Sequence, residues 1–201
     1  MIINKLNLSL ANNRSVTARW PQLATVTADG KPSVRNIAFR GFLKEYLPSI
    51  DERIGNCLMF ITDCRSKKVK DIRGNSSVEI CWFFPDTSEQ FRIQGHASLI
   101  LPHSSVNIPQ SLRSVNSDEL DGLRRAVWSR LSSAARAQFT WPLAEHNKQG
   151  FPEDACLSLN SDDPRSKDAL ENFSLIMVEP LGIELLDLNV KPFGIIQEFF
   201  R

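Results

Sequence analysis

The sequence has few of the residues from which metal sites and disulfide frameworks are built. Among 201 residues there are three histidines and four cysteines. The cysteines form no C-x-x-C pair, and the histidines have no carboxylate or second histidine at ligand spacing. We therefore expect no metal centre and no disulfide scaffold, and we interpret the cysteines, which lie partly inside apolar runs, as buried free thiols.

The sequence also lacks a strong net charge and a long hydrophobic run. Lys and Arg number 24 against 23 Asp and Glu, so the formal charge is +1, and nothing global favours nucleic acid or an anionic membrane. Nowhere do roughly 18 apolar residues run together, and no basic stretch precedes an apolar one at the N-terminus. We expect a cytoplasmic protein without nucleic-acid or membrane partners, in which any anion site is local.

What is present fits one globular domain over residues 1–201, with 42% hydrophobic and 23% charged residues. Alternating or continuous apolar segments predict several strands. Residues 28–31 contain Asp29-Gly30, the turn of a tight hairpin. The expected strands cover residues 22–27, 33–43, 57–62, 78–84 and 90–101, with a closing pair at 173–180 and 182–188.

Helical patterns interrupt these strands. Residues 3–11 fit an amphipathic helix, although alternating leucines leave a strand open. Ser66 is a natural N-cap for a helix over residues 66–73, apolar spacings of three and four predict a helical insert over about 117–140, and residues 144–170 are polar and loop-like. With core strands over about 20–102, this order predicts a mainly β, α+β fold: an antiparallel barrel with helical additions.

The helix that begins at Ser66 carries an unusual charge pattern. Lys67, Lys68 and Lys70 lie in its first turn, where the helix dipole disfavours cations. An anion bound to backbone N–H groups, to the Ser66 or Thr62 hydroxyl and to the lysines would explain this pattern. A solvated basic surface is the alternative.

Polar residues on two other predicted strands extend this hypothesis. Arg35 lies in a strand that otherwise looks half-buried, where an arginine needs a carboxylate or phosphate partner. A structural ion pair is the alternative to a ligand. Gln90 and Arg92 lie on the polar face of their strand, and they offer donors to a heteroaromatic ring or simply face solvent.

Four ordered segments resemble the motif blocks of the pyridoxamine 5'-phosphate oxidase family. These are residues 35–42, residues 60–63 with 65–68, Asn75, and residues 89–95. Residues 126–128 and 136–142 further resemble a bacterial and cyanobacterial subgroup of FMN-binding relatives that is distinct from the biosynthetic oxidase. The resemblance covers residues 20–102 well and the rest loosely. It implies a split β-barrel that binds FMN, in a homodimer with two FMN sites at the interface.

The resemblance also implies roles for particular residues. Arg35 and Lys68 would hold the FMN phosphate, with Lys67 where the family often has arginine, and Arg40 matches a family lysine that contacts substrate phosphate. Gln90 would hydrogen-bond the flavin, and residues 136–138 would reach the partner's site. The residues that would line the isoalloxazine and ribityl chain are Asn36, Ile37, Ala38, Ile61 and Thr62.

The end of the sequence departs from the family pattern. The oxidases usually place a tryptophan in the final strand pair and an Arg-x-His-x-Arg-like motif after it, and neither is present in residues 183–201. We therefore expect an FMN-dependent oxidoreductase for a small reduced substrate, without assuming pyridoxamine phosphate. The alternatives are a flavin or haem binding protein for storage or sensing, and a structural dimer with an empty site.

Overall fold

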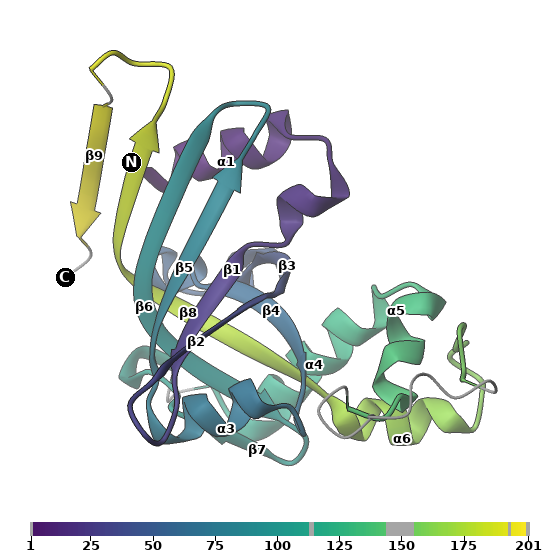
Figure 1. Cartoon of the computed structure of the whole chain (residues 1–201). Coiled ribbons are helices and arrows are strands. Elements are labelled where there is room, and N and C mark those ends of the chain that lie inside the picture. The colour runs from purple at the N-terminus through teal and green to yellow at the C-terminus, as the bar shows by residue number, and fades with distance from the viewer. Residues whose placement is uncertain (1, 113–114, 144–154, 193, 200–201) are drawn as a thin grey trace.

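The computed structural model describes residues 2–112, 115–143, 155–192 and 194–199. A curled antiparallel sheet has the strand order β2-β1-β5-β6-β8-β4-β3, with β7 paired to β6 and β9 to β8 (Figure 1). Its strands are β1 (Gln22–Val26), β2 (Pro32–Asn36), β3 (Ala38–Phe42), β4 (Leu58–Asp63), β5 (Ser77–Phe84), β6 (Glu89–Leu101), β7 (Ser104–Val106), β8 (Phe173–Asp187) and β9 (Gly194–Phe199).

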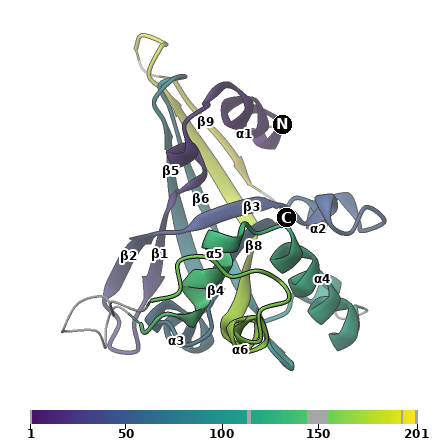
Figure 2. The same cartoon turned by 90° about the vertical axis from the view of Figure 1, so that its right-hand side faces the viewer.

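Helices lie at the ends of this sheet. The α-helices are α1 (Ile2–Asn12), α2 (Glu52–Gly55), α3 (Lys67–Gly74), α4 (Ser117–Ser129), α5 (Ser133–Ala137) and α6 (Arg165–Asn172), and the 3-10 helices are η1 (Val16–Arg19), η2 (Leu43–Glu45), η3 (Gln110–Leu112) and η4 (Gln138–Thr140). Figures 1 and 2 show α3 beneath the β1 and β2 end, α1 at the opposite end, and α4, α5 and α6 together at one side. The fold is an antiparallel half-barrel with helices, as the sequence predicts.

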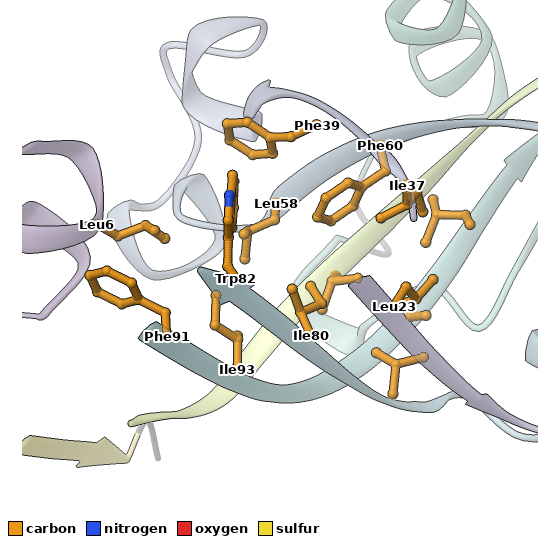
Figure 3. Packing of buried hydrophobic residues seen from close by; sticks show 14 of the residues in the cluster. Leu6, Leu23, Ile37, Phe39, Leu58, Phe60, Ile80, Trp82, Phe91 and Ile93 are labelled. Atoms are coloured by element: carbon orange, nitrogen blue, oxygen red, sulfur yellow. The ribbon is translucent and has the colours of Figure 1, made fainter. Parts of the chain in front are cut away.

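The concave face of the sheet holds the larger core. Trp82 lies at its centre, with its ring 4.9 Å from that of Phe39, and its indole N–H donates to the Ala18 carbonyl at 2.7 Å. Leu6 of α1 and Phe91 of β6 pack into the same cluster (Figure 3). A second cluster on the other face joins β4 and β8 to the helices α4 to α6. These two cores cover both faces of β4, which explains its continuous apolar run.

Helix α1 and strands β1, β4, β5 and β6 lie where the sequence predicts them. The predicted strand over residues 33–43 is wrong, because the chain breaks at Ile37. Strand β2 pairs with β1, whereas β3 pairs with β4 at the other edge of the sheet. The Ile37 N–H donates to the Pro21 carbonyl, in register with the β1–β2 pairing, and the next residue, Ala38, already pairs with Ile61 of β4. The break lets one segment contribute to both edges, which no local pattern predicts.

The predicted closing strand pair is also wrong. Strand β8 continues from residue 173 to residue 187 through Pro180. The register with β6 shifts between Gln94 and Gly95, which face Gly182 and Pro180 respectively. Leu181 is therefore the extra residue of a β-bulge, and proline is tolerated there because it needs no ladder N–H.

The predicted insert over 117–140 is two helices and a 3-10 turn rather than one helix. Helix α4 ends at Ser129, and Ser132 caps α5 by accepting from the Ala135 N–H at 3.2 Å. The predicted loop over 144–170 contains α6, and its residues 144–154 lie outside the described residues. Strands β7 and β9 were not predicted. In β9 the residues Ile195, Ile196 and Phe199 are exposed, so it lacks the alternation that indicates a half-buried strand.

Candidate functional site

The connection from β4 to α3 gathers hydroxyl and ammonium donors. Thr62 and Ser66 have their hydroxyl oxygens 3.2 Å apart, and the Lys68 ammonium lies 3.4 Å from the Thr62 hydroxyl. Ser66 occupies the N-cap position, as predicted, but its side chain makes no capping hydrogen bond. The first turn of α3 contains no acidic residue. The donor set therefore suits an anion with several oxygen acceptors, such as a phosphate.

Arg35 lies against the same helix. It faces Leu23 across the β1–β2 ladder and so points to the concave side. Its guanidinium donates to the hydroxyls of Thr25 and Ser33, each at 2.7 Å, and lies 3.5 Å from the Asp71 carboxylate. Asp71 lies three residues after Lys68 on α3.

Asp71 is therefore the carboxylate partner of the structural ion pair that the sequence analysis gave as the alternative to a ligand at Arg35. A guanidinium has five N–H donors, and 3.5 Å is long for a charge-assisted hydrogen bond. The contact with Asp71 is consequently compatible with a further anion.

The predicted lining residues come from two neighbouring strands. Ala38 of β3 pairs with Ile61 of β4, so residues 36–38 lie beside residues 61–62. Thr62 and Ile37 are buried, and Asn36 is exposed at the end of β2. Thr62 shares the concave side with Phe60, whereas Ile61 packs against the helical cluster on the other side.

Gln90 is not brought together with these residues. It lies between Glu89 and Phe91, whose side chains are buried on the concave side, so its own side chain points to the convex side. Within one protomer Gln90 and Arg35 therefore lie on opposite faces of the sheet.

Arg40 lies in a separate pocket of about 360 Å³ that contains two further arginines. Its Nε is buried without a hydrogen-bond partner, and burial lowers the pKa of its guanidinium. Arg130, the C-cap residue of α4, lies over the Tyr46 ring at 4.5 Å, and the Tyr46 hydroxyl donates to the Arg40 carbonyl at 2.6 Å. Arg19 of η1 also lines the pocket.

The acid that lines this pocket is already engaged. The Glu45 carboxylate accepts from the Phe42 N–H at 2.7 Å, and no described carboxylate pairs with Arg19, Arg40 or Arg130 at ion-pair distance. An orphaned buried guanidinium nitrogen is costly without an acceptor. The pocket therefore suits an anionic group. Sequence reasoning missed Arg19, Tyr46 and Arg130, because η1 and the end of α4 meet Arg40 only in the folded chain, and Tyr46 joins them there.

Comparison with known proteins identifies the family. Residues 3–101 match the sequence model described as "Pyridoxamine 5'-phosphate oxidase, FMN-binding domain". A solved pyridoxamine 5'-phosphate oxidase-related, FMN binding protein from Nostoc punctiforme is 31% identical, with a TM-score of 0.69 over 98% of this chain and 95% of that one. This chain belongs to the pyridoxamine 5'-phosphate oxidase-related, FMN-binding family.

Further relatives and structural neighbours differ in how much of this chain they match. Pyridoxine/pyridoxamine 5'-phosphate oxidase 2 of Arabidopsis thaliana is 28% identical over 89% of this chain and 78% of its own. The oxidase of Leptospira biflexa is 36% identical, but over only 39% of this chain and 32% of its own length. PhzG of Burkholderia lata shares the fold, with a TM-score of 0.62 at 16% identity over 99% of this chain and 91% of that one.

The matched FMN-binding domain contains Arg35, Ser66 and Lys68, and the family's cofactor is FMN. The donors at the β4–α3 connection fit its phosphate, since they are hydroxyl, ammonium and guanidinium groups without an acid in the first helical turn. Among the described residues, no group of three or more His, Cys, Asp or Glu could hold a metal ion. In the same part of the chain, no helix is both long and apolar enough to cross a membrane.

Proposed function

We propose that this protein is an FMN-dependent oxidoreductase whose small reduced substrate carries an anionic group. The pocket of Arg19, Arg40 and Arg130 is the observation that carries this proposal, because a protein that only stored flavin would not need a second anion site beside the first. When bound, FMN supplies the hydride acceptor. The chain's own residues position the two reactants.

Strand β3 connects the two proposed sites. The backbone of residues 36–38 would line the flavin, and Arg40 follows two residues later on the same strand, a rise of about 7 Å. An anion held by Arg40 and Arg130 would therefore place the rest of a small substrate beside the ring. Burial raises the pKa of Tyr46, and its hydroxyl donates to the Arg40 carbonyl.

The position of Gln90 supports a homodimer with FMN at the interface. Because Gln90 and Arg35 lie on opposite faces of one sheet, Gln90 reaches a flavin only in the site of a second copy. The convex face around it is half-buried to exposed and carries both signs of charge, with Arg92 and Glu184 3.0 Å apart. Such a surface can pair with a copy of itself around a two-fold axis.

One observation favours a flavin or haem binding protein without turnover as the second candidate. Residues 183–201, which include the end of β8 and all of β9, contain neither the tryptophan nor the Arg-x-His-x-Arg-like motif of the oxidases. In that case the arginine pocket would hold an anion that is not oxidised.

The absorbance spectrum of purified protein, followed by anaerobic mixing with pyridoxamine phosphate or NADPH, tests the proposal. We expect a flavin spectrum that bleaches with an anionic donor and returns in air. A flavin that stays oxidised with every anionic donor would favour storage, and a haem spectrum would overturn the proposal.

Substitution in the arginine pocket tests the proposed substrate site. Arg130→Met should raise KM roughly 10- to 150-fold, the equivalent of about 1.5–3 kcal/mol for hydrogen bonds to a charged group, with FMN affinity unchanged. Arg125→Met is the matched control, because Arg125 lies on the same helix, is exposed and pairs with Asp121. Equal KM values for both variants would show that the arginine pocket does not bind the substrate.

A further inference from the structure

A larger groove lies between the β1–β2 turn and α3. Its volume is about 850 Å³, and it shares Ser66 and Lys67 with the proposed phosphate site. From there it extends along α3 past Lys70 to Asn75 at the helix C-cap. A volume of this size falls within the range of about 300–1,000 Å³ that is usual for small-molecule sites.

The charge left uncompensated in this groove is positive. The Asp29 carboxylate lies 2.7 Å from the Lys31 ammonium, whose hydrogen bond lowers the pKa of Asp29. Asp71 accepts from Thr25 at 2.8 Å and pairs with Arg35. Lys67 and Lys70 are exposed, and the structure gives neither an ion pair within 4 Å among the described residues. The groove should therefore favour an anion beside these two lysines.

Glycines keep parts of the groove open. A Cβ added at Gly30 or at Gly74 would meet no atom within 4 Å. At Gly30 the φ angle of +78° requires glycine in the turn, but Gly74 has no such conformation. A side chain introduced at Gly74 can therefore enter the groove without a clash, which makes this residue suitable for a test.

We propose that the groove accepts the adenylate half of FAD, so that the protein binds FAD as well as FMN with the isoalloxazine in one place. This inference rests on the proposed phosphate site. If the flavin phosphate lies at Ser66 and Lys68, the part of a ligand that enters the groove is the part bonded beyond that phosphate. Lys67 and Lys70 lie about 4.5 Å apart along the helix axis, and their flexible side chains can contact the second phosphate. The lining also includes Val26 and Ala28, beside which the adenine can lie.

Titration of the full-length apoprotein with FMN and with FAD tests this inference. We expect the Kd of FAD to lie within about tenfold of the Kd of FMN. Lys70→Ala should weaken FAD several-fold and leave FMN unchanged, because it removes only the contact with the second phosphate. Gly74→Glu should weaken FAD at least about tenfold, through both filling and repulsion, again without affecting FMN.

Gly122→Glu is the matched control. Gly122 lies on α4, where an added Cβ also meets nothing within 4 Å, and this variant should bind both flavins as the wild type does. If the wild type bound FMN but not FAD, this inference would be wrong and the proposed function would stand. The same conclusion would follow if neither Lys70→Ala nor Gly74→Glu changed the ratio of the FAD Kd to the FMN Kd. Failure of the wild type to bind FMN would overturn the proposed function and this inference together.

Discussion

Arg35 has two candidate partners, the Asp71 carboxylate and the FMN phosphate, and a pair of substitutions separates them. Arg35→Met removes both contacts at once. Arg35→Met combined with Asp71→Asn also removes the buried carboxylate that the first change leaves behind. We expect the combined variant to recover stability but not FMN affinity.

The structure sets the expected size of each effect. The Asp71 side chain is 4% exposed and the Arg35 side chain 21%, so Arg35→Met leaves a buried carboxylate that still accepts a hydrogen bond from the Thr25 hydroxyl. We expect a loss of about 1–3 kcal/mol in the free energy of unfolding, below the value for a fully buried pair because Arg35 is partly solvated. FMN affinity should fall by about 1.5–3 kcal/mol, or roughly 10- to 150-fold.

Two measurements on each variant are needed. Chemical denaturation of the apoprotein gives the free energy of unfolding, and fluorescence titration with FMN gives the Kd. In the combined variant the neutral amide at position 71 still accepts from Thr25, so most of the stability should return while the Kd stays raised. Arg165→Met is a control, because Arg165 forms an exposed pair with Asp163 at 2.7 Å outside the site.

Recovery of both stability and FMN affinity in the combined variant would refute this reasoning. It would show that Arg35 acts only by neutralising the Asp71 carboxylate of α3. Lys68→Ala, which leaves the Arg35 and Asp71 pair in place, should weaken FMN by a similar factor without the loss of stability.

Other substitutions test contacts that stabilise the sheet and its helices. Burial raises the pKa of Glu89, but hydrogen bonds led by that of Lys5 outweigh it and hold the pKa below 4.5. This stabilisation is present above the unfolded pKa and is lost as pH falls through the folded one. Glu89→Gln lacks it at every pH, so the variant should unfold at a higher pH than the wild type during acid titration. Lys5→Met should lower the free energy of unfolding by about 1–3 kcal/mol. Gly95→Ala should cost about 1–3 kcal/mol, because its Cβ would overlap the Glu179 carbonyl oxygen, whereas Gly122→Ala should stabilise α4 by about 0.5–1 kcal/mol in the same denaturation assay. Arg124→Met should cost about 2–4 kcal/mol, since the fully buried guanidinium donates to the carbonyls of Leu170 and Phe173.

Much of the fold could be predicted from local patterns. The apolar run at β4, the Asp29-Gly30 turn and the alternation along β6 identify their elements without tertiary information. The failures lie where a distant partner decides. Ile37 breaks a continuous strand pattern because β2 and β3 join different edges of the sheet, and Pro180 lies inside β8 because the bulge opposite Gly95 accommodates it.

The candidate site divides in the same way. Arg35, Ser66 and Lys68 could be singled out because a cation-rich helix start and a half-buried arginine are unusual in themselves. The arginine pocket could not, since Arg19, Arg40 and Arg130 come from three elements and each is ordinary in its own segment. That Gln90 and Arg35 lie on opposite faces of the sheet likewise depends on the strand pairing.

By itself, the sequence determined that this chain forms an antiparallel barrel with hydroxyl and ammonium groups at the start of α3, because periodicity, turn chemistry and helix-end charge are local properties. Tertiary structure alone decided which carboxylate lies beside Arg35, which arginines surround Arg40, and that Gln90 points away from the phosphate donors. These depend on strand register and on the packing of distant segments. A one-residue shift in register would exchange the two faces of a strand, and no local pattern contains that information.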